Sequence, residues 1–133
     1  MVEFTYRLQI LEHHLDTFGH VNNAVYLELY EQARWDFITI NGYGLSEMQQ
    51  KRQGPVILEA KIKYRKELNN REWITIRSFD IYVKGKMMGL SQQIINEKGE
   101  VASSATFMMG FMDLKERKLI TPPEIWLKAV GLK

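Results

Sequence analysis

The sequence predicts a two-layer α+β domain, in which one long helix packs on a five-stranded antiparallel sheet. Five segments alternate apolar and polar residues, which is typical of half-buried strands. One segment repeats apolar residues every three or four positions, which is typical of a helix. Short turns join the last four strand segments, so we expect these strands to pair as antiparallel neighbours. A length of 133 residues fits one domain, expected to span residues 1–133.

The first elements follow in chain order. Residues 4–10 alternate apolar and polar side chains and predict a strand. Residues 13–23 follow no period and contain glycine, asparagine and aspartate, which predicts a loop. Residues 23–41 place their apolar side chains on one helical face, with Asn22 or Asn23 as the expected N-cap.

The later elements complete the sheet. Gly42 is expected to end the long helix, and a short second helix is expected over residues 45–53. Within the strand expected over residues 72–83, the alternation slips between Ile76 and Phe79, which predicts a bulge or a twist. The proline pair at residues 122–123 is suited to start a short terminal helix. The four later strands are expected over residues 56–65, 72–83, 86–95 and 101–112.

A sheet with one helix on one face leaves its other face and its edges partly uncovered. Phe107, Met109 and Phe111 alternate along the last strand and indicate more burial than one helix supplies. A second copy of the chain is the natural cover for such a surface. We therefore expect a homodimer, and a homotetramer of paired dimers is the alternative left open.

Composition excludes several classes of protein. Hydrophobic residues make up 45% of the chain and charged residues 26%, which is enough apolar mass for a core and excludes a disordered tail. The chain has no cysteine, which excludes disulfides, thiolate metal sites and a cysteine nucleophile, and fits a reducing compartment. The first residues lack the pattern of a signal peptide, and no segment is apolar enough for a membrane span. A cytoplasmic protein is expected.

The net charge of +2 hides an uneven distribution. Residues 1–50 carry 2 basic and 7 acidic residues, whereas residues 51–86 carry 10 basic and 4 acidic residues. The basic segment suits a polyanion or a phosphate-bearing small molecule, and the alternative is a strand face that is merely solvated by lysine and arginine. No nucleic-acid-binding motif accompanies the basic residues, so a nucleic-acid partner is not expected.

The residues most suited to chemistry lie between the first strand and the long helix. Asp16 places a carboxylate a few residues before the helix start, where free backbone N–H groups can hold developing negative charge on an oxygen. The carboxylate could act there as a general base or a nucleophile, and Gly19 would let a substrate approach the backbone closely. The alternative is that Asp16 caps the helix or accepts hydrogen bonds within the loop.

Residues 16–26 have the pattern Asp-x-x-Gly-His-Val-Asn-Asn-x-x-Tyr. This pattern resembles the signature of the hotdog-fold acyl-CoA thioesterases, and most closely that of the 4-hydroxybenzoyl-CoA thioesterase-like group. Residues 31–34 and 55–64 resemble two further segments of the same group. The resemblance implies a long helix wrapped by a curved antiparallel sheet, two protomers that pair their sheets, and an active site at their interface.

The resemblance also implies roles for single residues. The acidic residue of the family falls on Asp16, as a nucleophile or as the base for a water. The backbone N–H that polarises the thioester carbonyl falls on Asn23. His20 corresponds to a histidine that assists catalysis in the related plant-type acyl-carrier-protein thioesterases. Those enzymes have an asparagine where this chain has Phe18, so their full constellation is absent. The reaction requires no metal or redox cofactor.

Three basic residues of the predicted strand after the helices would suit the phosphates of coenzyme A at the rim of the site. They are Lys61, Lys63 and Arg65, and the neighbouring Lys66 and the turn residues Lys84 and Lys86 suit the same role. Their alternative role is the solvated strand face described above.

Other polar residues carry both a structural and a functional interpretation. Gly19 and Tyr26 are expected beside the substrate, although a packing role is favoured for the Tyr26 ring. Glu31 and Arg34 lie three apart on the helix, which favours a local ion pair over a supporting role in the site. The histidine pair at residues 13–14 matches no metal-ligand spacing, so no metal site is expected.

These observations predict an acyl-CoA thioesterase that hydrolyses a fatty or aromatic acyl-CoA to the free acid and CoA. The alternatives are an acyl-ACP thioesterase, a hotdog hydratase that pairs Asp16 with His20, and a noncatalytic acyl-CoA-binding protein. Binding alone needs no carboxylate beside a thioester, and this favours the enzyme.

Overall fold

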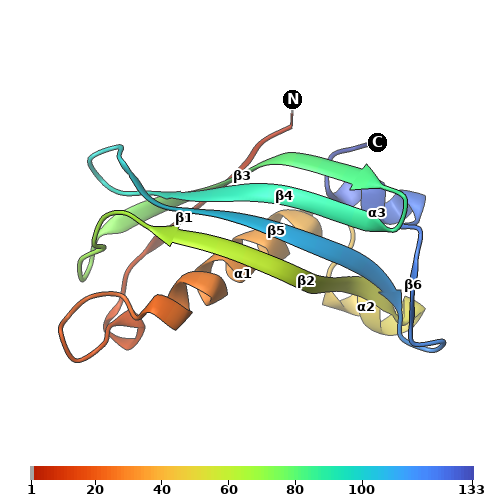
Figure 1. The fold of residues 1–133 in the computed structure, drawn as a ribbon, viewed down its shortest axis with the longest axis horizontal. Coiled ribbons are helices and arrows are strands. Elements are labelled where there is room, and N and C mark those ends of the chain that lie inside the picture. Colours follow the sequence, from red (N-terminus) through yellow and green to blue (C-terminus); the bar gives the residue numbers. More distant parts are fainter. Residues whose placement is uncertain (1) are drawn as a thin grey trace.

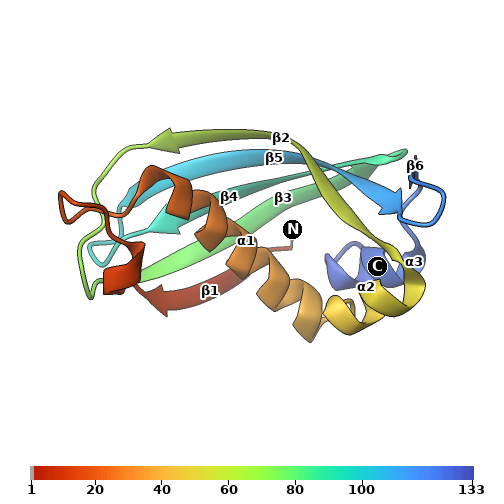
Figure 2. The same cartoon turned by 90° about the horizontal axis from the view of Figure 1, so that it is seen from below.

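The computed structural model describes residues 2–133, which form one antiparallel sheet and three α-helices. Figures 1 and 2 show the sheet as a curved layer with α1 against its inner side, and α2 and α3 near one end of the molecule. None of these helices is long and apolar enough to cross a membrane. In chain order the elements are β1 (Phe4–Gln9), the 3-10 turn η1 (Glu12–His14), α1 (Asn23–Ile40), α2 (Leu45–Lys51), β2 (Gln53–Tyr64), β3 (Trp73–Lys84), β4 (Met87–Ile95), β5 (Val101–Asp113), β6 (Lys118–Ile120) and α3 (Glu124–Ala129).

The strands lie in the order β1-β3-β4-β5-β2, and every neighbouring pair is antiparallel. This confirms the α+β class and the antiparallel sheet. The sequence predicts five strands, whereas β6 adds a sixth by pairing with β5. A strand of three residues inside a charged stretch shows no alternation, so the pattern cannot reveal it. β2 begins at Gln53, earlier than the predicted residue 56, so it includes Gly54 and Pro55 and the last residue of the predicted second helix.

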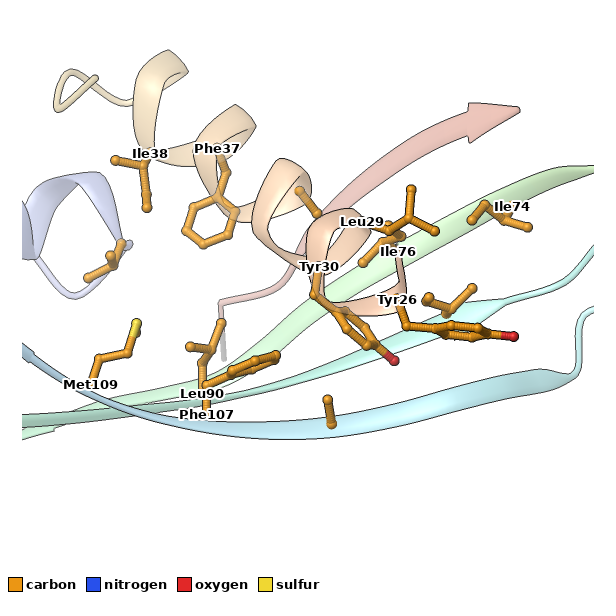
Figure 3. Packing of buried hydrophobic residues seen from close by; sticks show 14 of the residues in the cluster. Tyr26, Leu29, Tyr30, Phe37, Ile38, Ile74, Ile76, Leu90, Phe107 and Met109 are labelled. Atoms are coloured by element: carbon orange, nitrogen blue, oxygen red, sulfur yellow. The ribbon is translucent and has the colours of Figure 1, made fainter. Parts of the chain in front are cut away.

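The capping residues set the ends of α1 as predicted. Asn22 is the N-cap, because its Oδ1 accepts a hydrogen bond from the Ala24 N–H at 2.9 Å. The helix ends at Ile40, and Gly42 follows with a φ of +104°, a region that glycine enters readily. Figure 3 shows how side chains of α1 reach toward the sheet. The buried residues of the helix are Tyr26, Leu29, Tyr30, Ala33, Arg34, Phe37 and Ile38.

The apolar residues of β5 are buried within one chain. Phe107, Met109 and Phe111 all belong to the core. The Phe107 ring packs edge-on against a tyrosine of α1, and Phe111 contacts the rings of Tyr43 and of Trp126 in α3. The expectation that these side chains need cover from a second copy is therefore wrong, because α1, α3 and the segment after α1 cover them.

The irregularity in β3 lies later than the sequence predicts. The register with β4 shifts between Phe79 and Tyr82, and Asp80 has a φ of +51°. The sequence places the slip before Phe79 because Ser78 interrupts the apolar alternation. Ser78 nevertheless faces the core, where its hydroxyl accepts a hydrogen bond from Gln92 Nε2 at 2.9 Å. A buried polar group with a partner keeps the strand regular at this point.

Candidate active site at the start of α1

The connection from β1 to α1 contains η1 and then a tight turn, which is the predicted catalytic loop. Leu15 and Val21 form an antiparallel bridge that joins the two arms of the loop. The Asp16 N–H donates to the His20 carbonyl at 2.8 Å, and the Gly19 N–H donates to the Asp16 carbonyl at 3.1 Å. Gly19 has a φ of +80°, which a side chain would oppose. The turn therefore holds Asp16 and His20 on opposite arms, facing each other.

The Asp16 carboxylate holds this turn with one of its two oxygens. Oδ1 accepts hydrogen bonds from the Phe18 N–H at 2.9 Å and from the His20 N–H at 3.3 Å. Within residues 2–133, Oδ2 makes no hydrogen bond. The structural interpretation of Asp16 as a loop acceptor is thus correct for Oδ1. Oδ2 keeps its full capacity to accept a proton or a hydrogen bond.

The first turn of α1 presents an unpaired backbone N–H at Asn23. Asn22 anchors the helix start, because its own N–H donates to the His14 carbonyl at 3.0 Å. The Asn23 N–H donates to no atom of the described chain, as expected for the first residue of a helix. Such N–H groups form the positive end of the helix dipole. This group can stabilise negative charge on an oxygen that lies within hydrogen-bond reach of it.

An open pocket of about 290 Å³ lies beside this helix start. Four predicted site residues line it, namely His20, Asn23, Tyr26 and Arg65. The Tyr64 hydroxyl donates to the Asn23 carbonyl at 3.0 Å, and the rings of Tyr26 and Tyr64 pack edge to face with centroids 4.9 Å apart. Burial raises the pKa of the Tyr26 hydroxyl, which therefore stays protonated at neutral pH. The structure gives Tyr26 the packing role that the sequence favours.

Glu67 is a residue of this pocket that the sequence analysis missed. Its Oε2 lies 3.3 Å from His20 Nε2, and both side chains line the pocket. In the sequence, Glu67 follows Arg65 and Lys66 in a charged run with the composition of a solvated surface. Only the fold brings it near His20, because the chain leaves β2 at Tyr64 beside the start of α1.

The structure separates the three basic residues expected to bind phosphate. Lys61 and Lys63 line a different hollow of about 570 Å³ on the outer face of the sheet, away from α1. Beyond the end of β2, the N–H groups of Arg65 and Lys66 both donate to the Ala102 carbonyl, at 2.9 and 3.1 Å. This irregular turn ends the strand alternation and brings Arg65 and Lys66 to the pocket beside α1.

The predicted ion pair between Glu31 and Arg34 is absent from the described residues, so that prediction is wrong. The Arg34 side chain is directed inward, where its Nη1 donates to Gln92 Oε1 at 2.9 Å. Its guanidinium lies over the Phe107 ring, 4.4 Å from the centroid. Burial lowers the pKa of Arg34 to about 10, so the group stays charged at neutral pH. The three-residue spacing wrongly predicts an ion pair, because the Arg34 side chain faces the sheet whereas the Glu31 side chain is exposed.

The site therefore combines two adjoining parts. His20, Asn23, Tyr26 and Arg65 share the pocket, whereas Asp16 and its free Oδ2 belong to the neighbouring turn with Gly19. An unpaired N–H, a carboxylate and a histidine–carboxylate pair are the groups that can polarise a carbonyl and direct water toward it.

Comparison with known proteins identifies the family of the chain. The model of the thioesterase-like superfamily matches residues 11–130, which include the loop, all three helices and the sheet except β1. The chain belongs to the thioesterase-like superfamily. This family of thioester hydrolases has the hotdog fold, so the resemblance seen in residues 16–26 and the fold that it implies are confirmed.

Individual relatives agree with this assignment. The chain is 34% identical over 115 residues to the long-chain acyl-CoA thioesterase FadM of Escherichia coli, with 86% of each chain covered. The structure of YbaW, a probable thioesterase of Escherichia coli, has a TM-score of 0.81 at 30% identity and covers 97% of both chains. A Staphylococcus aureus protein solved in complex with CoA shares the fold, with a TM-score of 0.89 at 22% identity, covering 98% of this chain and 82% of that one.

Proposed function

We propose that this member of the thioesterase-like superfamily hydrolyses the thioester of a fatty or aromatic acyl-CoA to the free acid and CoA. Water adds to the carbonyl carbon, the carbon–sulfur bond breaks, and CoA leaves as a thiolate that takes up a proton. The observation that carries the proposal is the unpaired Asn23 N–H next to a turn whose Asp16 has a free carboxylate oxygen. A thioester needs few further groups, because its thiolate is a good leaving group.

Each residue has a proposed role. The Asn23 N–H donates to the carbonyl oxygen and stabilises the negative charge that develops there. Asp16 Oδ2 takes the proton of the attacking water or attacks the carbonyl carbon itself. His20 supports this step from within the pocket, and Glu67, 3.3 Å from its Nε2, holds the ring in position.

The pocket also supports an acyl-CoA as the substrate. Arg65 and Lys66 line it and are the proposed contacts of the CoA phosphates. Lys61 and Lys63 lie on the other face of the sheet, which leaves them the role of a solvated strand face. A relative with 34% identity is named as a long-chain acyl-CoA thioesterase, and this supports a fatty acyl group.

A homodimer is proposed at the free edge of β2. β2 pairs with β5 on one side only, so the backbone groups of its other edge have no strand partner within residues 2–133. The side chains of Ile57, Leu58 and Tyr64 are 44%, 47% and 49% exposed along this strand. Sedimentation equilibrium should give twice the chain mass of 15.7 kDa, and a value equal to that mass would contradict the dimer.

Two substitutions at Asn23 test the proposed role of its N–H. Asn23→Pro removes that N–H, and proline is tolerated at the first residue of a helix, where the extended Asn22 precedes it. Thiol release from a panel of short, long and aromatic acyl-CoAs should fall by about 100-fold or more in kcat. Asn23→Ala keeps the N–H and should stay near wild type.

Matched controls make this experiment decisive. Leu45→Pro changes the first residue of α2, far from the pocket, and should leave turnover unchanged. Equal activities of the Asn23→Pro and Asn23→Ala variants would contradict the role of the N–H. Hydrolysis of acyl-ACP but of no acyl-CoA would show that the acyl group is carried by acyl carrier protein rather than by CoA. Tight acyl-CoA binding without thiol release would indicate a binding protein.

A further inference from the structure

Arg34 is a buried cation that lacks a carboxylate partner. Its side chain is 7% exposed, and no carboxylate of the described chain lies within ion-pair distance of it. Burying an unpaired charge is costly, even when the ring of Phe107 and the amide of Gln92 contact it. A group held in this way is poised to bind something that the chain itself does not supply.

Arg34 has unused hydrogen-bond donors and lines a small pocket. A guanidinium has five N–H donors, and Arg34 makes a single hydrogen bond within residues 2–133. Every fully enclosed polar side-chain atom among these residues has a partner, so the unbonded nitrogens of Arg34 retain access to solvent. The pocket has about 80 Å³, and its lining consists of Arg34, Glu31, Trp35, Ile38, Pro55, Ile57 and Met109.

The chemistry of this pocket selects a hydroxyl group. The charged residues of its lining are a donor, Arg34, and an acceptor, Glu31, and the other residues are apolar or aromatic. A hydroxyl can accept from the guanidinium and donate to the carboxylate, whereas Glu31 would repel a second carboxylate. The volume is about that of two or three water molecules, which is enough for the hydroxyl-bearing end of a chain.

The pocket and the proposed active site lie along one strip of the molecule, which consists of the inner face of α1 and the strands that it packs on. Tyr26, Tyr30 and Arg34 follow one another four residues apart among the buried residues of α1. Phe107 of β5 contacts both Tyr30 and Arg34, and Figure 3 shows its ring below Tyr30. From Asn23 to Arg34 the helix rises by roughly 16 Å, at about 1.5 Å per residue.

β2 runs beside this strip in the opposite sense. Tyr64 lies at the active-site pocket and Ile57 at the Arg34 pocket. Between them, Ala60 and Ile62 face the helix side of the sheet, because they pair with the core residues Phe107 and Ala105. Ala60 is exposed in the single chain, so the strip is open along the β2 edge that the proposed dimer would cover.

We infer that Arg34 and Glu31 form a subsite for a hydroxyl group at the far end of the acyl chain, so that hydroxylated acyl thioesters are preferred substrates. This inference rests on the proposed thioesterase activity and deepens it. Arg34 and Glu31 act here as specificity-determining residues, remote from the reacting carbonyl.

Matched substrates test the subsite. Acyl-CoAs of increasing length are compared in pairs, one unsubstituted and one with a terminal hydroxyl. At the length that places the hydroxyl at Arg34, kcat/KM should be about tenfold higher for the hydroxylated member. Arg34→Met should abolish this preference while retaining hydrolysis of the unsubstituted substrate. Arg77→Met, on the outer face of the sheet, should keep the preference.

Several outcomes would overturn the subsite. They are a wild type without preference at any length, a preference that survives in Arg34→Met, and a stronger preference for a terminal carboxylate than for a hydroxyl. Circular dichroism checks the fold of Arg34→Met. Arg34→Lys, which keeps a charged donor, provides a second variant that should retain part of the preference.

A binding measurement separates this inference from the proposed activity. Calorimetry compares the free hydroxylated fatty acid with the plain fatty acid, and needs no turnover. Tighter binding of the hydroxylated acid that is lost in Arg34→Met would uphold the subsite even if no acyl-CoA were hydrolysed. Equal binding of the two acids, with normal thioester hydrolysis, would overturn the subsite and leave the proposed activity standing.

Discussion

Two turns of this molecule use the same local chemistry in different surroundings. In the loop before α1, Asp16 Oδ1 accepts from the N–H groups of Phe18 and His20 at 2.9 and 3.3 Å. In the turn between β5 and β6, Asp113 Oδ1 accepts from the N–H groups of Lys115 and Glu116 at 2.9 and 3.2 Å. Both carboxylates hold a tight turn in this way.

The surroundings differ in the groups that a substrate would meet. The Asp16 turn adjoins a pocket with an unpaired helix N–H at Asn23 and with the His20–Glu67 pair. The Asp113 turn closes a hairpin, and none of residues 113–116 lines the pocket beside α1. An aspartate before a helix is therefore informative about function only together with what the fold places next to it.

The largest expected difference between the two turns is catalytic. Asp16→Asn keeps an acceptor oxygen for the turn but loses the charge, and should lower kcat by about 100-fold, as expected for a principal catalytic group. Asp113→Asn makes the same change in the other turn and should leave kcat within about twofold of wild type. Thiol release from acyl-CoA measures both, and equal losses in the two variants would refute the assignment.

A smaller effect is expected from the carboxylate that contacts His20. Glu67→Gln should lower kcat about fivefold, because an exposed ion pair contributes at most about 1 kcal/mol to the position of the ring. The pH profile of kcat should change with it, which a purely structural role would not cause. Glu3→Gln breaks an ion pair with Arg77 on the other side of the sheet and serves as the control. An unchanged pH profile of kcat in Glu67→Gln would contradict the proposed role of Glu67 in positioning His20.

Stability should not distinguish the two turns. Asp16→Ala and Asp113→Ala each leave two backbone N–H groups without their acceptor, and each should lower the free energy of unfolding by about 1 kcal/mol. Thermal unfolding should show a decrease in Tm of about 3–5 °C for each. A much larger decrease for Asp16→Ala would indicate that its loss of activity reflects unfolding.

The same comparison shows which features the sequence can reveal. The turn at Gly19, the N-cap at Asn22 and the helix that follows are local, because the residues that determine them are neighbours in the chain. The resemblance in residues 16–26 is local as well. These features, together with the antiparallel sheet, could be predicted, and the structure and the comparisons confirm them.

Features that depend on tertiary placement could not be predicted. Glu67 meets His20 only because β2 ends beside α1. Arg65 lies in a different pocket from Lys61 and Lys63, because the N–H groups of Arg65 and Lys66 both donate to the Ala102 carbonyl. This double contact ends the strand alternation. Arg34 looks like the partner of Glu31 on a helical wheel, but the sheet buries it against Gln92. In each case a long-range contact overrides the local pattern.

The smallest expected effect is a pH dependence of stability that originates next to the Asp16 turn. His14 lies just before this turn, is 8% exposed, and accepts a hydrogen bond on Nδ1 from the Leu11 N–H at 2.9 Å. Burial lowers the pKa of His14, nearby His13 lowers it further, and Glu28 acts in the opposite direction. The folded state therefore holds the imidazole neutral, since a protonated Nδ1 cannot accept the Leu11 N–H.

This shift has a defined consequence for stability. In the unfolded chain His14 takes up a proton near its usual pKa of about 6.5, whereas the folded chain resists protonation. The unfolded state then binds more protons below that pH, so the free energy of unfolding should fall as the pH drops from 7.5 to 5.5. His14→Asn offers Oδ1 to the Leu11 N–H without titrating, so urea unfolding should show a smaller pH dependence than wild type. The protection factor of the Leu11 amide in hydrogen exchange should fall in acid only in the wild type, because only there is the acceptor of its N–H protonated. An equal response in both proteins would mean that His14 does not couple pH to this turn.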